Sequence, residues 1–184
     1  DGDELNIVLS EETQGQYRVT CHNQDELLLA EIIAGSMPPM PADIGLGGPA
    51  KATPKVEINW DNVVPAEVFV EKTWSLREAE NNRYCAEISD HDPVYDEHIH
   101  PHYLLSLANY CLMEEYQMPA WIHASSITNH RAALKVGDMI TSKTVVKEKF
   151  ERKGHQFITL HITYWRGEAL TTDILHTAIF RIAE

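Results

Sequence analysis

Alternation of apolar and polar positions divides the chain into a short strand-rich beginning and a longer mixed part. Residues 5–34 contain the apolar segments LNIVLS, QYRVTCHN and LLLAEIIAG, which are separated by polar turns and predict three β-strands. Three strands without a helix bury little apolar surface by themselves. We therefore expect this segment to join a larger sheet or to pair with another chain.

The following segment, residues 36–66, lacks any hydrophobic period and is rich in Pro and Gly. Such a composition is typical of a linker or of an arm that wraps around a neighbouring domain. The pattern thus predicts an N-terminal strand segment at 1–35, a linker or arm at 36–66 and a main domain at 67–184.

The main domain begins with a predicted strand at 68–76 and a helical turn within 77–89. A longer helix is predicted over residues 100–117, before Met118-Pro119 ends it. Its apolar residues recur at the i, i+3, i+4 spacing of a helix with one buried face. They are Leu104, Leu107, Ala108, Cys111 and Leu112.

Strands alone are predicted after this helix, in the segments 121–133, 139–150, 157–165 and 170–182. Alternation places Ile158, Leu160, Ile162 and Tyr164 on one face, and Leu170, Ile174, Ala178, Phe180 and Ile182 on one face of the last strand. One helix among antiparallel strands predicts an α+β fold in which a sheet wraps round a single central helix.

Charge and apolar runs exclude several classes of protein. The formal net charge of −13 argues against binding to nucleic acid or to an anionic membrane surface, which require clustered Lys and Arg. No apolar run is long enough for a membrane span, and no signal peptide is recognisable. Cys21, Cys85 and Cys111 lack paired spacing, so we expect free thiols and a cytoplasmic protein. The chain begins without Met, and we expect a fragment or a processed piece.

Titratable groups are concentrated just before the predicted helix, in the segment SDHDPVYDEHIHPHYLL at 89–105. This segment contains Asp90, Tyr95 and His100, whose candidate catalytic roles rest on the family resemblance described below. A metal site is the alternative, but His98 and His100 would converge on one ion only in an extended segment. Because the helix start uses the same residues, we expect no metal site and no cofactor. In a purely structural interpretation, the aspartates cap a turn and Pro101 begins the helix.

The order of elements and three motifs together resemble one family. The motifs SDHDPVYD, IHPHYLLSLAN and ALKVGDMI resemble those of the MaoC-like (R)-specific enoyl-thioester hydratases and dehydratases, which have the hotdog fold. In that family a loop reading Asp-x-Asn-Pro-x-His precedes a helix that begins with His-Gly. The resemblance covers roughly residues 68–182. The first 34 residues resemble the last strands of another hotdog, which implies descent from a double-hotdog parent.

The resemblance implies roles for the three candidate residues. In the family, an Asp and a His activate water, and a backbone N–H at the His-Gly helix start binds the thioester oxygen. Asp90 falls on the catalytic Asp and Tyr95 on the catalytic His, so Tyr95 or His100 is expected to donate the proton. A rewired pair of Asp90 with His100 or with His98 is the alternative. Pro101 occupies the Gly position and has no N–H to offer.

The resemblance also implies substrate-binding positions and partners. Ser106 falls on a Ser that lines the family's pocket. On the following strand, His123 and either Ser125 or Ser126 are expected to face the same cavity, with Ser125 as the candidate substrate-binding residue. The implied substrate is an acyl thioester of CoA or acyl carrier protein. A homodimer, or pairing with another hotdog chain, is expected because a single hotdog leaves a sheet edge exposed.

Three functions remain open from the sequence. The first is a hydratase or dehydratase of acyl thioesters with a non-standard site. The second is a non-catalytic hotdog subunit that binds acyl thioesters or supports a partner chain. The third is a thioesterase, since one fold hosts several chemistries.

Overall fold

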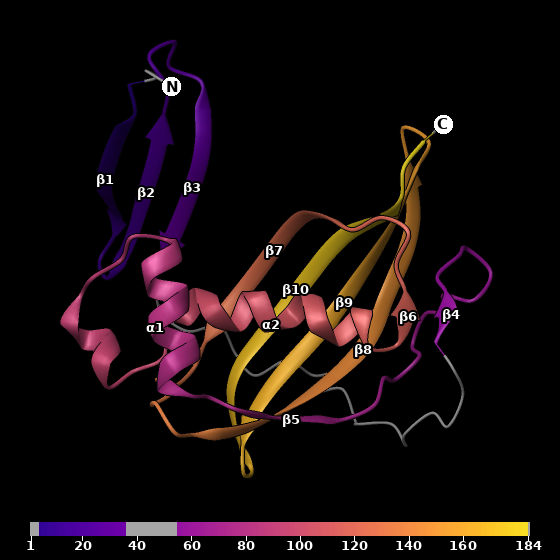
Figure 1. Ribbon diagram of the computed structural model, residues 1–184. Helices are drawn as coiled ribbons and strands as arrows, with labels where there is room; N and C mark the ends of the chain where they lie inside the picture. Colours follow the sequence, from indigo (N-terminus) through magenta and orange to yellow (C-terminus); the bar gives the residue numbers. More distant parts are fainter. Residues whose placement is uncertain (1–3, 36–54, 184) are drawn as a thin grey trace. The chain divides into compact units, whose positions relative to one another are not determined.

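The computed structural model describes residues 4–35 and 55–183 of the chain, which divides into two compact units, Asp1–Met40 and Pro41–Glu184. The first unit is an antiparallel sheet with the strand order β1-β2-β3 (Figure 1). Its strands are β1 (Asn6–Thr13), β2 (Gln16–His22) and β3 (Leu28–Ala34). The three strands predicted at the start of the chain are therefore confirmed.

A five-stranded antiparallel sheet with the order β5-β8-β9-β10-β7 forms the body of the second unit. Its strands are β5 (Lys72–Ser75), β7 (Ile122–His130), β8 (Met139–Arg152), β9 (His155–Arg166) and β10 (Ala169–Arg181). Smaller elements are β4 (Val56–Glu57), β6 (Tyr116–Gln117), helix α1 (Glu78–Glu87) and the 3₁₀ turn η1 (Pro93–Asp96). Helix α2 (Pro101–Met113) lies across one face of the sheet (Figure 1).

Helix α2 buries the face that its apolar spacing predicts. Leu104, Leu107, Ala108, Cys111 and Leu112 are all buried. The helix ends at Met113, earlier than the predicted residue 117, because Tyr116 and Gln117 pair in parallel with Val56 and Glu57. That pairing joins residues far apart in sequence, and no local signal indicates it.

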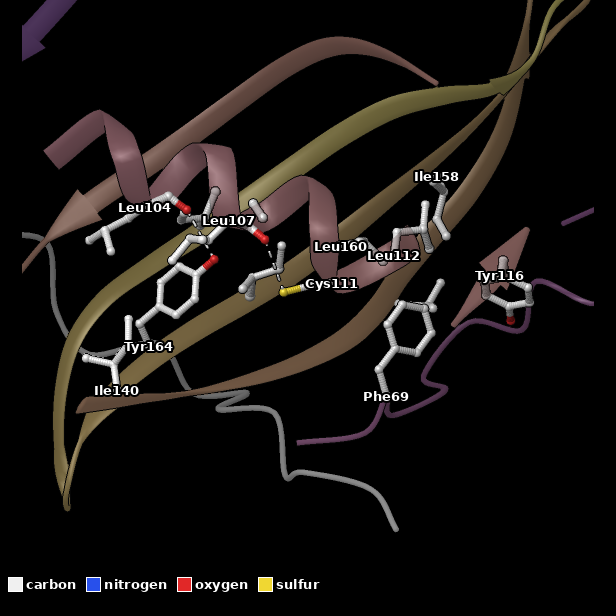
Figure 2. Packing of buried hydrophobic residues seen from close by; sticks show 14 of the residues in the cluster. Phe69, Leu104, Leu107, Cys111, Leu112, Tyr116, Ile140, Ile158, Leu160 and Tyr164 are labelled. Atoms are coloured by element: carbon white, nitrogen blue, oxygen red, sulfur yellow. Dashed lines mark hydrogen bonds between the residues drawn. The ribbon is translucent and has the colours of Figure 1, made fainter. Parts of the chain in front are cut away.

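The central strand β9 supplies the floor of the core. Ile158, Leu160, Ile162 and Tyr164 are fully buried, as their alternation predicts, and they belong to the same core cluster as the buried residues of helix α2. Figure 2 shows Leu160 and Tyr164 beside this helix. The hydroxyl of Tyr164 donates to the carbonyl of Leu104 at 3.1 Å, so this buried polar group is paired. Full burial of each aliphatic side chain contributes about 1.5–3 kcal/mol.

Three predictions, on the last strand, on the strand at 68–76 and on the linker or arm, need correction or refinement. Ile182, expected on the buried face of β10, lies beyond the last paired residue and is exposed. The strand predicted at 68–76 is regular only over Lys72–Ser75, although Val68 makes an isolated bridge to Val145. Of the predicted linker or arm, residues 36–54 lie outside the described residues. Ile58 and Val63, from its last part, are buried in the core.

The turn between β8 and β9 is a two-residue turn whose residues, Lys153 and Gly154, both have positive φ values of 53° and 77°. Such a turn matches the right-handed twist of the strands it joins. It lies between the strands predicted at 139–150 and 157–165. None of the helices in the described ranges is long and apolar enough to cross a membrane.

Candidate active site

The segment between helices α1 and α2 is held in place by one buried amide side chain. Asn81 of α1 has no solvent exposure. Its Nδ2 group donates to the carbonyls of Tyr95 at 2.8 Å and His98 at 3.0 Å, and its Oδ1 atom accepts from the N–H of His100 at 2.9 Å. Asn81 therefore fixes the backbone of three residues from the His-rich segment, and sequence reasoning did not identify it.

The two aspartates of the loop shape its turn. The carboxylate of Asp90 accepts a hydrogen bond from the N–H of Asp92 at 3.1 Å, and the carboxylate of Asp92 accepts one from the N–H of Val94 at 2.9 Å. Asp92 is thus the N-cap of η1. The capping role expected for both aspartates is confirmed, and for Asp90 it leaves the second carboxylate oxygen available.

That second oxygen faces His100, a residue that is only 8% exposed. The Nδ1 atom of His100 accepts the N–H of His102 at 3.1 Å, which caps helix α2. Because Nδ1 carries a lone pair, a neutral ring has its proton on Nε2, and Nε2 lies 3.3 Å from Oδ2 of Asp90. The ring of Tyr95 lies on the same imidazole, with 4.5 Å between ring centroids. The structure thus brings the three predicted catalytic residues together.

Tyr95 is suited to donate a proton and not to accept one. Burial raises the pKa of its phenol, and the negative charges of Asp90 and Asp92 raise the pKa further. The hydroxyl therefore stays protonated across the neutral range.

The start of helix α2 offers little to an oxyanion. Pro101 has no N–H, the N–H of His102 is bonded to Nδ1 of His100, and the N–H of Tyr103 is bonded to the carbonyl of His100 at 3.0 Å. These first three positions of the helix have no free amide donor. The departure from His-Gly noted in the sequence therefore has a structural counterpart.

A cavity of about 610 Å³ opens beside this site, between η1, the start of α2 and the segment after β7. Its walls are mainly apolar, and its polar groups come from Tyr95, His98, His130 and Arg131. The Nδ1 atom of His98 is buried and has no hydrogen-bond partner among the described residues. An apolar cavity with few convergent polar groups is the usual form of a small-molecule site. The sequence suggested His98 only as an alternative partner of Asp90 or as a metal ligand.

Tyr95 also borders a second, smaller crevice of about 250 Å³, which contains Asp90, His91 and Asp92. Tyr95 is thus the lining residue that the acidic crevice and the mainly apolar cavity share. Asp90 lines the crevice and is not among the described residues that line the cavity of 610 Å³.

The predicted substrate-binding residues lie farther along helix and sheet. The hydroxyl of Tyr84 contacts Nδ1 of His102, and burial raises the pKa of this phenol, an effect that Ser106 opposes. His123 contacts Ser126, with 2.8 Å between Nε2 and Oγ. Neither Ser106 nor His123 is among the described residues that line the cavity of 610 Å³.

The structure corrects the prediction that Ser125 faces the same side of the sheet as His123. It pairs with Thr177 across the sheet, and adjacent strand residues point to opposite faces, so Ser126 is the serine that shares a face with His123. A register shift opposite Thr177 and Ala178 allows His123 and Ser126 to share that face. This bulge could not be read from the sequence.

The described residues hold no group of three or more His, Cys, Asp or Glu side chains placed to bind a metal ion. His98 and His100 are close in the segment but are directed differently, since His100 caps the helix while His98 lines the cavity.

No family model and no curated sequence matches the chain. Solved structures do match the fold. The (R)-hydratase from A. caviae involved in PHA biosynthesis has a TM-score of 0.54 at 18% identity, covering 65% of this chain and 98% of its own. The R-hydratase PhaJ1 from Pseudomonas aeruginosa has a TM-score of 0.53 at 18% identity, covering 67% and 85%.

A third match is the C-terminally truncated HadBC (3R-hydroxyacyl-ACP dehydratase) complex from Mycobacterium tuberculosis. It has a TM-score of 0.56 at 8% identity, covering 65% of this chain and 98% of the matched one. These likenesses confirm the predicted architecture: the chain has the hotdog fold.

Proposed function

We propose that this hotdog chain belongs to the MaoC-like branch and acts as a hydratase or dehydratase on an acyl thioester of CoA or acyl carrier protein. The carrying observation is the contact between Asp90 and His100 beside Tyr95, at the start of the central helix and next to an apolar cavity. The hydratases and dehydratase among the solved structures of the same fold support this choice.

In the proposed hydration, Asp90 acts as the general base. The Nε2–H of His100 orients the carboxylate of Asp90, and the side chain of Asp90 is 34% exposed and can therefore meet water. The carboxylate takes a proton from water as the water oxygen bonds to C3 of the enoyl thioester. The π electrons move toward the thioester oxygen, and C2 is then protonated from Tyr95. The proton on Asp90 returns to the Tyr95 phenolate through water, which restores both groups. Dehydration is the reverse sequence.

The missing helix N–H requires another donor for the thioester oxygen. We assign this role to the hydroxyl of Tyr95, because Tyr95 borders the cavity. Preorganised donors of this kind stabilise the negative charge that develops in the transition state.

A second candidate function is a non-catalytic subunit that binds acyl thioesters. The specific observation in its favour is the start of helix α2, where Pro101 lacks an N–H and the N–H groups of His102 and Tyr103 are already bonded. Such a site would hold a thioester in the cavity without stabilising the oxyanion.

Hydration of crotonyl-CoA, followed by loss of the enoyl-thioester absorbance, tests the proposal. We expect turnover by the wild type and its loss in Asp90→Asn. Glu87→Gln is the matched control, because Glu87 is an exposed carboxylate at the end of helix α1 and pairs only with Arg83 among the described ion pairs. Calorimetric binding of crotonyl-CoA without turnover supports the second candidate. The absence of both turnover and binding would contradict both candidate functions.

The proposal includes a dimer or a pairing with another hotdog chain. Strands β5 and β7 are the edges of the five-stranded sheet, and unpaired edges promote association. A dehydratase complex of the same fold supports this expectation. Light scattering at micromolar concentration tests it, and a monomeric mass contradicts it.

We also propose a cytoplasmic location and a double-hotdog ancestry. Cys21, Cys85 and Cys111 are free thiols, which suits a reducing compartment. The three-stranded sheet of residues 6–34 supports its origin in the last strands of a second hotdog.

A further inference from the structure

A serine hydroxyl lies between two histidines on strands β7 and β10, apart from the residues assigned to hydration. The Oγ atom of Ser126 lies 2.8 Å from Nε2 of His123 and 2.9 Å from Nδ1 of His176. The two imidazoles are stacked, with 4.8 Å between centroids and 7° between planes. Trp121 stacks on His176 with a centroid distance of 5.5 Å. The serine and the two histidines are therefore held in a defined geometry.

The direction of the two hydrogen bonds follows from the surroundings of His176, the buried member of the group. His176 is 1% exposed, and its Nε2 atom is buried without a partner among the described residues. A buried N–H without an acceptor is rarer than a lone pair without a donor. The proton of neutral His176 is therefore better placed on Nδ1, where it donates to Ser126. The hydroxyl of Ser126 must then donate to His123.

We propose that Ser126 is a nucleophile that accepts acyl groups from activated esters and thioesters, with His123 as its general base and His176 as a positioning residue. A serine that donates to an adjacent imidazole has the arrangement of an activated nucleophile. This inference goes beyond the proposed hydration and does not depend on it, since Ser126, His123 and His176 take no part in the proton transfers of that reaction.

The site is reachable from solvent. Ser126 is half-buried and His123 is exposed, whereas His176 forms the buried wall behind them. Strand β7 is an edge of the described sheet, so alternate backbone N–H groups point away from β10. These amides are the available donors for the oxyanion of a tetrahedral intermediate.

The acyl transfer requires no reactant other than the ester or thioester and water. The Oγ atom of Ser126 attacks the acyl carbon while its proton passes to Nε2 of His123. The carbon–oxygen bond of the aryl ester, or the carbon–sulfur bond of a thioester, then breaks, and the leaving group takes the proton from His123. Water hydrolyses the acyl-serine by the same route in reverse.

Incubation of the full chain with p-nitrophenyl acetate tests the proposal, with nitrophenolate release followed by absorbance and the acetylated residue mapped by peptide mass spectrometry. We expect an acetyl group on Ser126 and a burst of nitrophenolate. Ser126→Ala should lose the burst, and His123→Gln should slow it at least about 10-fold. Ser125→Ala is the matched control, because Ser125 is exposed, adjacent and on the opposite face.

The role of His176 is tested by two substitutions. His176→Asn keeps an N–H near the position of Nδ1 and should retain most of the acetylation rate, whereas His176→Phe keeps the stacking but lacks the donor and should lose it. A purely structural role predicts the opposite order. Wild-type protein that is acetylated only on lysines, or acetylated at equal rates on Ser125 and Ser126, overturns the proposal even if a variant fails to fold.

Discussion

Asp90 and His100 meet through Oδ2 and Nε2 at 3.3 Å, on the side of the imidazole away from the nitrogen that caps helix α2. One ring thus performs two tasks, because Nδ1 secures the helix start and Nε2–H orients the candidate base. A second proton on Nδ1 would break the cap. This geometry supports the proposal that Asp90, and not His100, accepts the proton from water.

The tautomer of His100 can be observed directly. We expect nitrogen-15 NMR at neutral pH to show the proton on Nε2, because Nδ1 accepts the N–H of His102 at 3.1 Å. The exposed His91 serves as an internal reference, since no hydrogen bond fixes its ring among the described contacts. Observation of a proton on Nδ1 of His100 would refute the assignment of roles.

Pro101→Gly should raise the rate of crotonyl-CoA hydration. The change supplies the N–H that is missing at the first position of α2, and one oxyanion donor is worth on the order of 100-fold in rate. It should also lower the free energy of unfolding by about 1 kcal/mol, because Gly loses more backbone entropy on folding. Pro119→Gly, beyond the end of the helix, is the control for this stability effect. An unchanged rate would show that the oxyanion does not lie at the helix start.

Asn81→Ala should lower the free energy of unfolding by about 3 kcal/mol. It leaves the carbonyls of Tyr95 and His98 and the N–H of His100 without their partner, and each unpaired buried group costs about 1–3 kcal/mol. Urea denaturation measures the loss. Asn82→Ala, at the exposed neighbouring position, should change it by less than about 0.5 kcal/mol. Equal effects would mean that the hydrogen bonds of Asn81 contribute nothing.

The stability of the protein should fall as the pH drops from about 6.5 to about 4 because of His176. Burial, followed by the charge of His123, lowers the pKa of His176 to about 4. Between these pH values the unfolded chain binds a proton that the folded chain does not, so stability is complete above about pH 6.5 and declines below it. The loss attributable to this group is on the order of 3 kcal/mol.

Chemical denaturation of the wild type and of His176→Gln at pH 7 and pH 4 isolates this contribution from that of the carboxylates. We expect the wild type to lose more stability over the interval than the variant does. Parallel losses in the two proteins would rule out a depressed pKa at this position.

Leu112→Ala should destabilise the fold by about 3 kcal/mol, because Leu112 is fully buried between α2 and the sheet and its truncation leaves a cavity. Met113→Ala, one residue further on an exposed side of the helix, should have an effect near zero. Thermal unfolding distinguishes the two, and similar shifts in Tm would contradict the observed helix orientation.

Local periodicity of apolar residues predicts most of the helices, strands and buried faces of this fold. The stripe from Leu104 to Leu112 and the alternation from Ile158 to Tyr164 are properties of single elements, so the sequence predicts them correctly. The early end of α2 depends on a parallel pairing with Val56 and Glu57, which are distant in sequence. Non-local pairings of this kind leave no periodic signal.

The candidate site was predictable only in part. The resemblance indicated Asp90, Tyr95 and His100 by their spacing, and these residues do meet. Asn81 has no such signal, because a polar residue in a polar helical segment looks solvent-exposed until the fold buries it. Ser126, and not Ser125, lies beside His123 because a bulge shifts the alternation of the strand by one residue.

The strands β8, β9 and β10 follow one another both in sequence and in the sheet (Figure 1). Their pairing closes only short loops, whereas β5 and β7 reach the sheet from far along the chain, and long loops cost more entropy to close. We expect the three consecutive strands to assemble first during folding. The loop with Asp90 and the start of α2 would then acquire order late, so a chain that has collapsed and resists proteolysis at its centre can still lack a formed site.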